Sequence, residues 1–180
     1  MQNQNIAKYH ISSRIFHWSM ALLIISLLAV GIYMDEFLAK DAPYRGTIYD
    51  LHKSFGVVVL LLFFARVINR FVHKAPKLPN ALPKWQKICA TIMHYKLYVL
   101  MFLMPLSGYL MSNSYGYPVK LFGLKLPFLV EKNYEAASFY GSCHKYLGYF
   151  LIAALLIHIA AAFKHRFFDK KENDVLTKML

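Results

Sequence analysis

The chain alternates between long apolar runs and short polar segments. Four runs lack Asp, Glu, Lys and Arg: MALLIISLLAVGIYM at 20–34, FGVVVLLLFFA at 55–65, LYVLMFLMPLSGYLM at 97–111 and YLGYFLIAALLIHIAAAF at 146–163. With its flanks each run reaches about 20 residues, enough for a helix to cross the ~30 Å hydrocarbon core of a bilayer. The pattern predicts an all-α membrane protein, a single domain over 1–180 whose four transmembrane helices cover approximately 14–34, 52–72, 92–112 and 144–164.

The first run also has features of a signal peptide, because Lys8 and Arg14 precede it. It is long for the apolar part of a signal peptide, and no A-x-A cleavage motif follows before Asp35. We therefore expect this run to be retained as the first transmembrane helix. Pro105 within the third run is compatible with a membrane helix, where neighbouring groups can satisfy the freed backbone.

Composition supports a membrane protein. Hydrophobic residues make up 58% of the chain and charged residues 17%, against roughly 45–50% and 25% in average globular domains. The net charge of +12 is therefore concentrated in the segments between the runs. That content of apolar residues excludes a disordered chain.

The distribution of Lys and Arg predicts the orientation of the helices. The N-terminal tail, the loop between the second and third helices and the C-terminal tail carry 2, 7 and 5 of them, whereas the two loops on the opposite side carry 7 together with six acidic residues. The positive-inside rule places both termini in the cytoplasm. The expected partner of this charge is the anionic lipid of the bilayer, and nothing in the pattern points to nucleic acid.

Cysteine and glycine motifs exclude several classes of protein. Cys89 and Cys143 fall on opposite sides of the expected membrane, so they cannot pair within one chain. The C-x-x-C-H motif of covalent c-type haem attachment does not occur. Neither a glycine-rich phosphate loop nor a Ser/His/Asp arrangement is present.

Histidines within or beside the apolar runs are the strongest functional signal. His158 lies inside the fourth run, where an ionisable side chain is costly and usually functional. His144 precedes it by fourteen residues, which in a helix is within about 40° of four full turns and about 21 Å along the axis. The two imidazoles therefore project from nearly one face at two depths of the membrane.

Each of these histidines has a candidate partner at its own depth. His52 opens the second helix near the level of His144, and His17 opens the first near the level of His158. These pairings give two bis-imidazole sites in one four-helix bundle, whose core is the usual place for such sites.

Small residues accompany all four of these histidines. In a helix, the residue four positions later lies on the same face, and a flat macrocycle stacked beside its ligand needs a small side chain there. The four neighbours are Gly56, Gly148, Ala21 and Ala162.

The other histidines fit less well. His94 opens the third helix and could reach the level of His17, but a tyrosine, Tyr98, stands four residues later; His94 is either an alternative ligand or a polar contact. We expect the remaining three to be solvated at the membrane surface: His10, His73 and His165.

Two imidazoles per site favour haem over a bare metal ion. Zinc commonly requires a third or fourth protein ligand, whereas a haem iron needs two axial ligands, for which imidazole is a usual choice. The sequence thus predicts two haems per chain, with His17, His52, His144 and His158 as iron ligands. Arg66 and Arg70 could bind the propionates of the inner haem, or equally anchor the helix to lipid headgroups.

The chain resembles the bacterial cytochrome b561 family along nearly its whole length. The segments that carry the resemblance are RIFHW (14–18), LHKSFG (51–56), ARVINR (65–70), LMPLSGYLM (103–111), FGLKLPF (122–128), CHKYLGY (143–149) and LIHIAAAF (156–163). The family's haem ligands fall on the four histidines selected above, and His94 also matches a family position.

The resemblance implies a multi-pass protein of the bacterial inner membrane that holds haem b noncovalently and exchanges electrons with ubiquinone or another quinone. One branch of the family oxidises superoxide at the outer face, which makes superoxide a candidate outer donor. One alternative is a haem b anchor subunit that passes electrons from a dehydrogenase or hydrogenase partner. Another is a non-redox transporter or scaffold with structural histidines.

Overall fold

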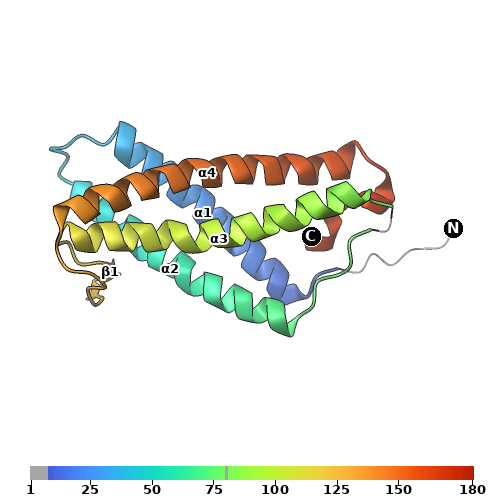
Figure 1. Ribbon diagram of the computed structural model, residues 1–180, viewed down its shortest axis with the longest axis horizontal. Helices are drawn as coiled ribbons and strands as arrows, with labels where there is room; N and C mark the ends of the chain where they lie inside the picture. Colours follow the sequence, from blue (N-terminus) through green and yellow to red (C-terminus); the bar gives the residue numbers. More distant parts are fainter. Residues whose placement is uncertain (1–7, 80) are drawn as a thin grey trace.

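Four long helices form the body of the molecule. The computed structural model describes residues 8–79 and 81–180, and within them the long helices are α1 (Ile11–Glu36), α2 (Arg45–Val72), α3 (Lys84–Ser114) and α4 (Tyr134–Phe167) (Figure 1). Each is long and apolar enough to cross a membrane. The predicted all-α, four-span bundle is confirmed. Residues 1–7 and 80 of the expected single domain lie outside the described residues, and the N-in, C-in orientation stays a prediction.

The helices extend beyond the apolar runs because polar residues start them. α4 begins about ten residues before its expected span: the side chain of Asn133 accepts a hydrogen bond from the backbone nitrogen of Ala136, and Glu135 lies in the first turn. Both features stabilise a helix N-terminus. α1 begins at Ile11, where the His10 ring accepts from the backbone nitrogen of Ser12.

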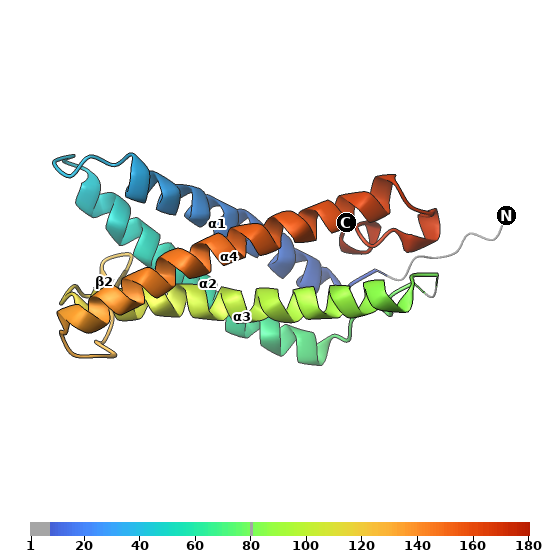
Figure 2. The ribbon, with the colours of Figure 1, turned by 45° about the horizontal axis from the view of Figure 1, so that its top comes forward.

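Packing divides the bundle into two helix pairs. α3 lies alongside α4 and α1 alongside α2, and the pairs are joined mainly through α2 and α3 (Figures 1 and 2). A small apolar core at mid-height includes Met20, Ile24, Val59, Met101 and Leu151. Most other large apolar side chains of the helices are exposed on the sides of the bundle, as lipid-facing residues of a membrane protein are.

A short β-hairpin interrupts the loop between α3 and α4, a feature that hydropathy does not indicate. Its strands are β1 (Lys120–Leu121) and β2 (Leu124–Lys125), paired antiparallel with Lys120 opposite Lys125. The turn residues Phe122 and Gly123 both have positive φ, 49° and 96°, as in the tight turns that suit the twist of a hairpin.

The C-terminal segment folds back onto the start of α1. The indole nitrogen of Trp18 donates to the carbonyl oxygen of Met179 at 2.9 Å. Asp174 is buried and pairs with Arg166 near the end of α4. Short 3₁₀ turns at Lys171–Asn173 and Thr177–Met179 complete the segment.

Candidate functional site

The first histidine pair lies between α2 and α4. The ring centres of His52 and His144 are 6.5 Å apart with an angle of 82° between the ring planes. Both rings line a cavity of ≈1050 Å³ that all four long helices border. The structure thus brings together the two histidines expected at the outer level of the membrane.

The dimensions of this cavity suit a haem. Metal–nitrogen bonds of about 2.0 Å on opposite sides of one iron would hold two imidazole centres roughly 6 Å apart. Gly31, Gly56, Gly108 and Gly148 also line the cavity. A Cβ added at Gly56 would meet no atom within 4 Å, so open space adjoins the backbone one turn after His52. The residues present therefore fit the group.

The imidazole of His144 is oriented by α3. Its Nδ1 lies 3.1 Å from the carbonyl oxygen of Met104 and 3.1 Å from the hydroxyl of Ser107. A proton on Nδ1 satisfies both contacts and leaves Nε2 as the free coordinating atom, the arrangement found for most metal-ligating histidines. Ser107 is itself buried, which protects these contacts from water.

Gly108 allows the imidazole of His144 to lie close to the α3 backbone. A Cβ on Gly108 would lie 2.8 Å from Cε1 of His144 and 3.1 Å from its Nδ1. Sequence reasoning missed Ser107 and Gly108 as site residues. The LMPLSGYLM segment (103–111) does contain polar and small residues after Pro105. Only the packing of α3 on α4 shows that they lie against His144.

His52 has a different environment from His144. Its Nδ1 is buried and has no hydrogen-bond partner among the described residues. The two rings of this pair are therefore inequivalent, with one fixed by a hydrogen bond and the other unpartnered.

The second histidine cluster lies nearer the opposite end of the bundle. The ring centres of His17 on α1 and His158 on α4 are 6.3 Å apart, with an angle of 63° between the ring planes. His94 on α3 is closer, with its ring centre 5.7 Å from that of His158. The structure therefore brings the expected pair together and adds His94 to it.

Arg66 belongs to this second cluster. Its Nη2 lies 3.3 Å from Nδ1 of His17, and its guanidinium stacks over the ring of Tyr98 at 5.8 Å. Arg70, one turn later on α2, is exposed. Of the two arginines considered from the sequence, Arg66 is the one held against the histidines.

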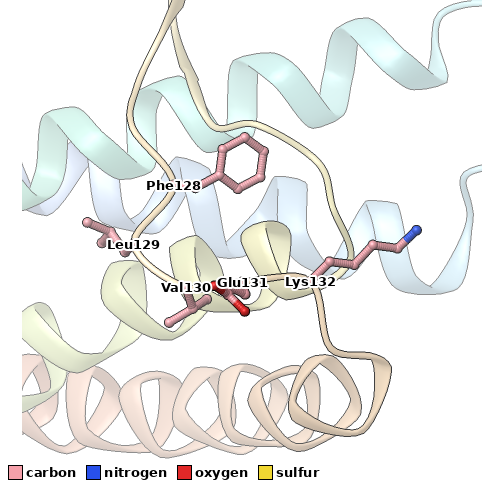
Figure 3. Close-up of a pocket in the computed structure, with 5 residues that line it drawn as sticks. All are labelled: Phe128, Leu129, Val130, Glu131 and Lys132. Atoms are coloured by element: carbon pink, nitrogen blue, oxygen red, sulfur yellow. The ribbon is translucent and has the colours of Figure 1, made fainter.

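Two other arrangements do not form a site. Among residues 8–79 and 81–180, no group of three or more His, Cys, Asp or Glu side chains could hold a bare metal ion. A separate hollow of ≈390 Å³ is lined by the consecutive loop residues 128–132 and contains no histidine (Figure 3).

The three histidines expected to be solvated are more structured than the sequence suggests. The rings of His10 and His73 stack with centres 3.7 Å apart, which ties the start of α1 to the end of α2. His165 bonds to Asp169 at 2.8 Å. The first contact joins residues far apart in the sequence, whereas the second is between residues four positions apart at the end of α4. Cys89 and Cys143 are both free.

Comparisons with known proteins identify the family of this chain. The family described as prokaryotic cytochrome b561 matches residues 8–180. Cytochrome b561 homolog 2 of Escherichia coli K12 is 31% identical over 175 residues, covering 96% of this chain and 91% of that protein. Cytochrome b561 homolog 1 of the same strain is 27% identical over 166 residues (91% and 92%). A protein of Yersinia pestis named "Probable superoxide oxidase CybB" is 24% identical over 164 residues (91% and 90%).

Proposed function

Because the chain belongs to the prokaryotic cytochrome b561 family, a family of membrane haem b electron-transfer proteins, we propose that it holds two b haems at two depths of the bacterial membrane. His52 and His144 would hold the iron of the outer haem, and His17 and His158 that of the inner haem. When bound, the haem irons supply one-electron redox chemistry. The protein sets their position and surroundings.

The observation that carries this proposal is the repetition of one arrangement on α4. His144 and His158 each have an imidazole from another helix at 6.5 and 6.3 Å. They are about 21 Å apart along the helix axis, so the two sites lie at different depths. Single structural histidines would not require matched partners at two levels.

Arg66 supports a binding role at the inner site. It lies beside His17, where a guanidinium would bind a propionate of the inner haem. At the outer end, Arg45, Lys53 and Lys145 border the cavity together with Asp35, Glu36 and Asp50. Lys53 pairs with Asp50 and Lys145 with Asp35, so the charges at this end balance.

The finer proposal is that superoxide is the outer donor and ubiquinone the acceptor. Two superoxide ions would be oxidised to two O₂, and the two electrons with two protons would reduce ubiquinone to ubiquinol. The name of the Y. pestis relative supports this choice of donor.

The first experiment is to count haem. Purified protein is examined by its reduced-minus-oxidised spectrum and by pyridine haemochrome assay. We expect two b haems per chain, falling to about one in His144→Ala and in His158→Ala. A folded, haem-reconstituted protein with one haem, or with none, contradicts the two-site proposal.

The donor and acceptor are tested separately. The holoprotein in lipid nanodiscs with ubiquinone receives superoxide from xanthine oxidase, and ubiquinol is measured. We expect ubiquinol formation that superoxide dismutase abolishes. If dismutase has no effect while both haems are present, superoxide is not the donor, and co-purification of a dehydrogenase or hydrogenase would then favour the anchor-subunit alternative.

A further inference from the structure

The β1–β2 hairpin folds back beside α2 instead of extending away from the end of the bundle (Figures 1 and 2). Lys120 Nζ binds Asp50 Oδ2 at 2.8 Å. The backbone nitrogen of Phe122 donates to the Ser54 hydroxyl at 3.1 Å, and the Phe122 ring meets that of Phe55 at 5.2 Å. The Ser54 hydroxyl also donates to the carbonyl oxygen of Lys120 at 2.8 Å. The turn at Phe122 therefore lies level with Ser54 and Phe55, and only the Lys120 side chain reaches back to Asp50.

The length of α2 sets the depth of that turn. Its 28 residues extend about 42 Å, which is about 12 Å more than the hydrocarbon core requires. Phe55 lies ten residues after Arg45, about 15 Å along the axis. Even if all the excess length projects from this end, Phe55 lies within the hydrocarbon, and any tilt of α2 places it deeper. Phe122, in contact with Phe55, reaches the same level.

The side chains at the turn are apolar and uncovered. Phe122 is 59% and Leu124 67% exposed, although the hydrogen bonds to Ser54 hold the adjacent backbone in place. In water these side chains would expose apolar surface at a cost of about 25 cal/mol per Å². In lipid they continue the exposed apolar surface of α2 at Phe55.

The base of the hairpin is cationic. Lys120 and Lys125 are opposite each other across the two strands. Lys120 is neutralised by Asp50, whereas Lys125 is exposed and makes no ion pair within the described part of the chain. A lysine just outside apolar side chains is the usual arrangement for binding headgroup phosphates.

We propose that the hairpin is a membrane-inserted element: Phe122 and Leu124 lie among the acyl chains of the leaflet nearer the N-terminus of α2, and Lys125 binds phospholipid phosphate above them. This role does not depend on the haem ligands, since none of its residues is one. It assigns a lipid-binding surface to a loop that otherwise would be read as solvated.

The test uses thiol reactivity, because only a hydrated thiolate reacts with a maleimide. Leu124→Cys is made in full-length holoprotein that also carries Cys89→Ser and Cys143→Ser. Glu131→Cys, an exposed position in the same loop (Figure 3), is the matched control. Both proteins are placed in nanodiscs of phosphatidylethanolamine and phosphatidylglycerol, and a water-soluble, membrane-impermeant maleimide is added.

We expect Leu124→Cys to react at least about tenfold more slowly than Glu131→Cys, since thiolate formation requires water, and both to react equally in denaturing detergent. Burial within the protein cannot produce that difference, because Leu124 is largely exposed. Phe122→Cys repeats the measurement at the turn. Rates for Leu124→Cys within about twofold of the control would show a hydrated thiolate and overturn the proposal.

Discussion

At the scale of single residues, Gly108 and His144 make the tightest approach of any glycine in the described residues. Any side chain at Gly108 would collide with the imidazole at 2.8 Å and would push the ring off its contacts with Met104 and Ser107 on α3. The ring would turn away from His52, and the outer pair would lose its geometry.

Gly108→Ala is therefore expected to lose the outer haem while the chain still inserts and keeps the inner one. Pyridine haemochrome assay should give about half the haem of the unaltered protein. Val99→Ala is the matched control, because Val99 is on the same helix, is 54% exposed and does not line the cavity. Full haem content in Gly108→Ala would show that His144 is not held as described.

Ser107 contacts Nδ1 of the His144 imidazole at 3.1 Å, and this contact affects the basicity of the ring. An acceptor at Nδ1 makes the imidazole more basic and favours the oxidised iron. Loss of a hydrogen bond of about 1 kcal/mol corresponds to a few tens of mV for a one-electron couple. Ser107→Ala should raise the midpoint potential of one haem by that amount in a redox titration, with haem content unchanged. A fall in potential would mean that the contact acts in the opposite sense.

His17 and His94 are alternative partners of His158 at the inner haem. Spacing along the sequence favours His17, and Arg66 lies beside it, although the ring of His94 is closer to His158. We expect His17→Ala to lose the inner haem and His94→Ala to retain it, measured as haem per chain. The reverse result would exchange the roles of the two residues.

The pairing of the four histidines could be predicted from the sequence. Helical periodicity places His144 and His158 on one face at two depths, and His52 and His17 open other helices at matching levels. Ser107 and Gly108 could not, since their role depends on how closely α3 approaches α4. The proximity of His94 to His158 was underestimated for the same reason: periodicity gives the level of a residue but not the distance between helices.

At the scale of elements, the C-terminal segment is fixed by a small acid-sensitive network. The Asn173 amide, the backbone nitrogen of Lys170 and His165 all bond to the Asp169 carboxylate and hold its pKa well below its usual range. A lowered pKa stabilises the folded segment above the unfolded pKa of about 3.9. The stabilisation is lost as the pH falls through the lower folded value.

The segment should therefore stay attached at neutral and mildly acidic pH and detach only in strong acid. Limited proteolysis of residues 168–180 across pH measures this. In Asp169→Asn the amide has no charge to lose, so the segment should be cleaved faster at neutral pH and with less dependence on pH. Equal cleavage of both proteins at neutral pH would remove Asp169 from this role.

Helix positions were predictable from hydropathy, but helix ends were not. Asn133 starts α4 well before the apolar run, because its side chain satisfies a free backbone donor. The hairpin was missed for a related reason: its strands have two residues each, too few for an alternating pattern to be visible.

At the scale of the whole molecule, the charge distribution predicts that both ends of the chain are cytoplasmic. Alkaline phosphatase, active only outside the cytoplasm, should be inactive when fused after Leu180 and active when inserted at Glu131. Green fluorescent protein should show the opposite pattern. Activity of the phosphatase at Leu180 would invert the orientation.

The division of the bundle into two helix pairs affects how stable the protein is in the cell before haem binds. α4 carries one histidine of each pair, and the partners are on α2 and α1. Haem bound at these positions would therefore hold the two helix pairs together. A chain inserted while haem is scarce would be held mainly by α2 against α3, with an unfilled cavity between the helix pairs. Such a chain is a natural substrate for membrane proteases, so its abundance should follow the haem supply.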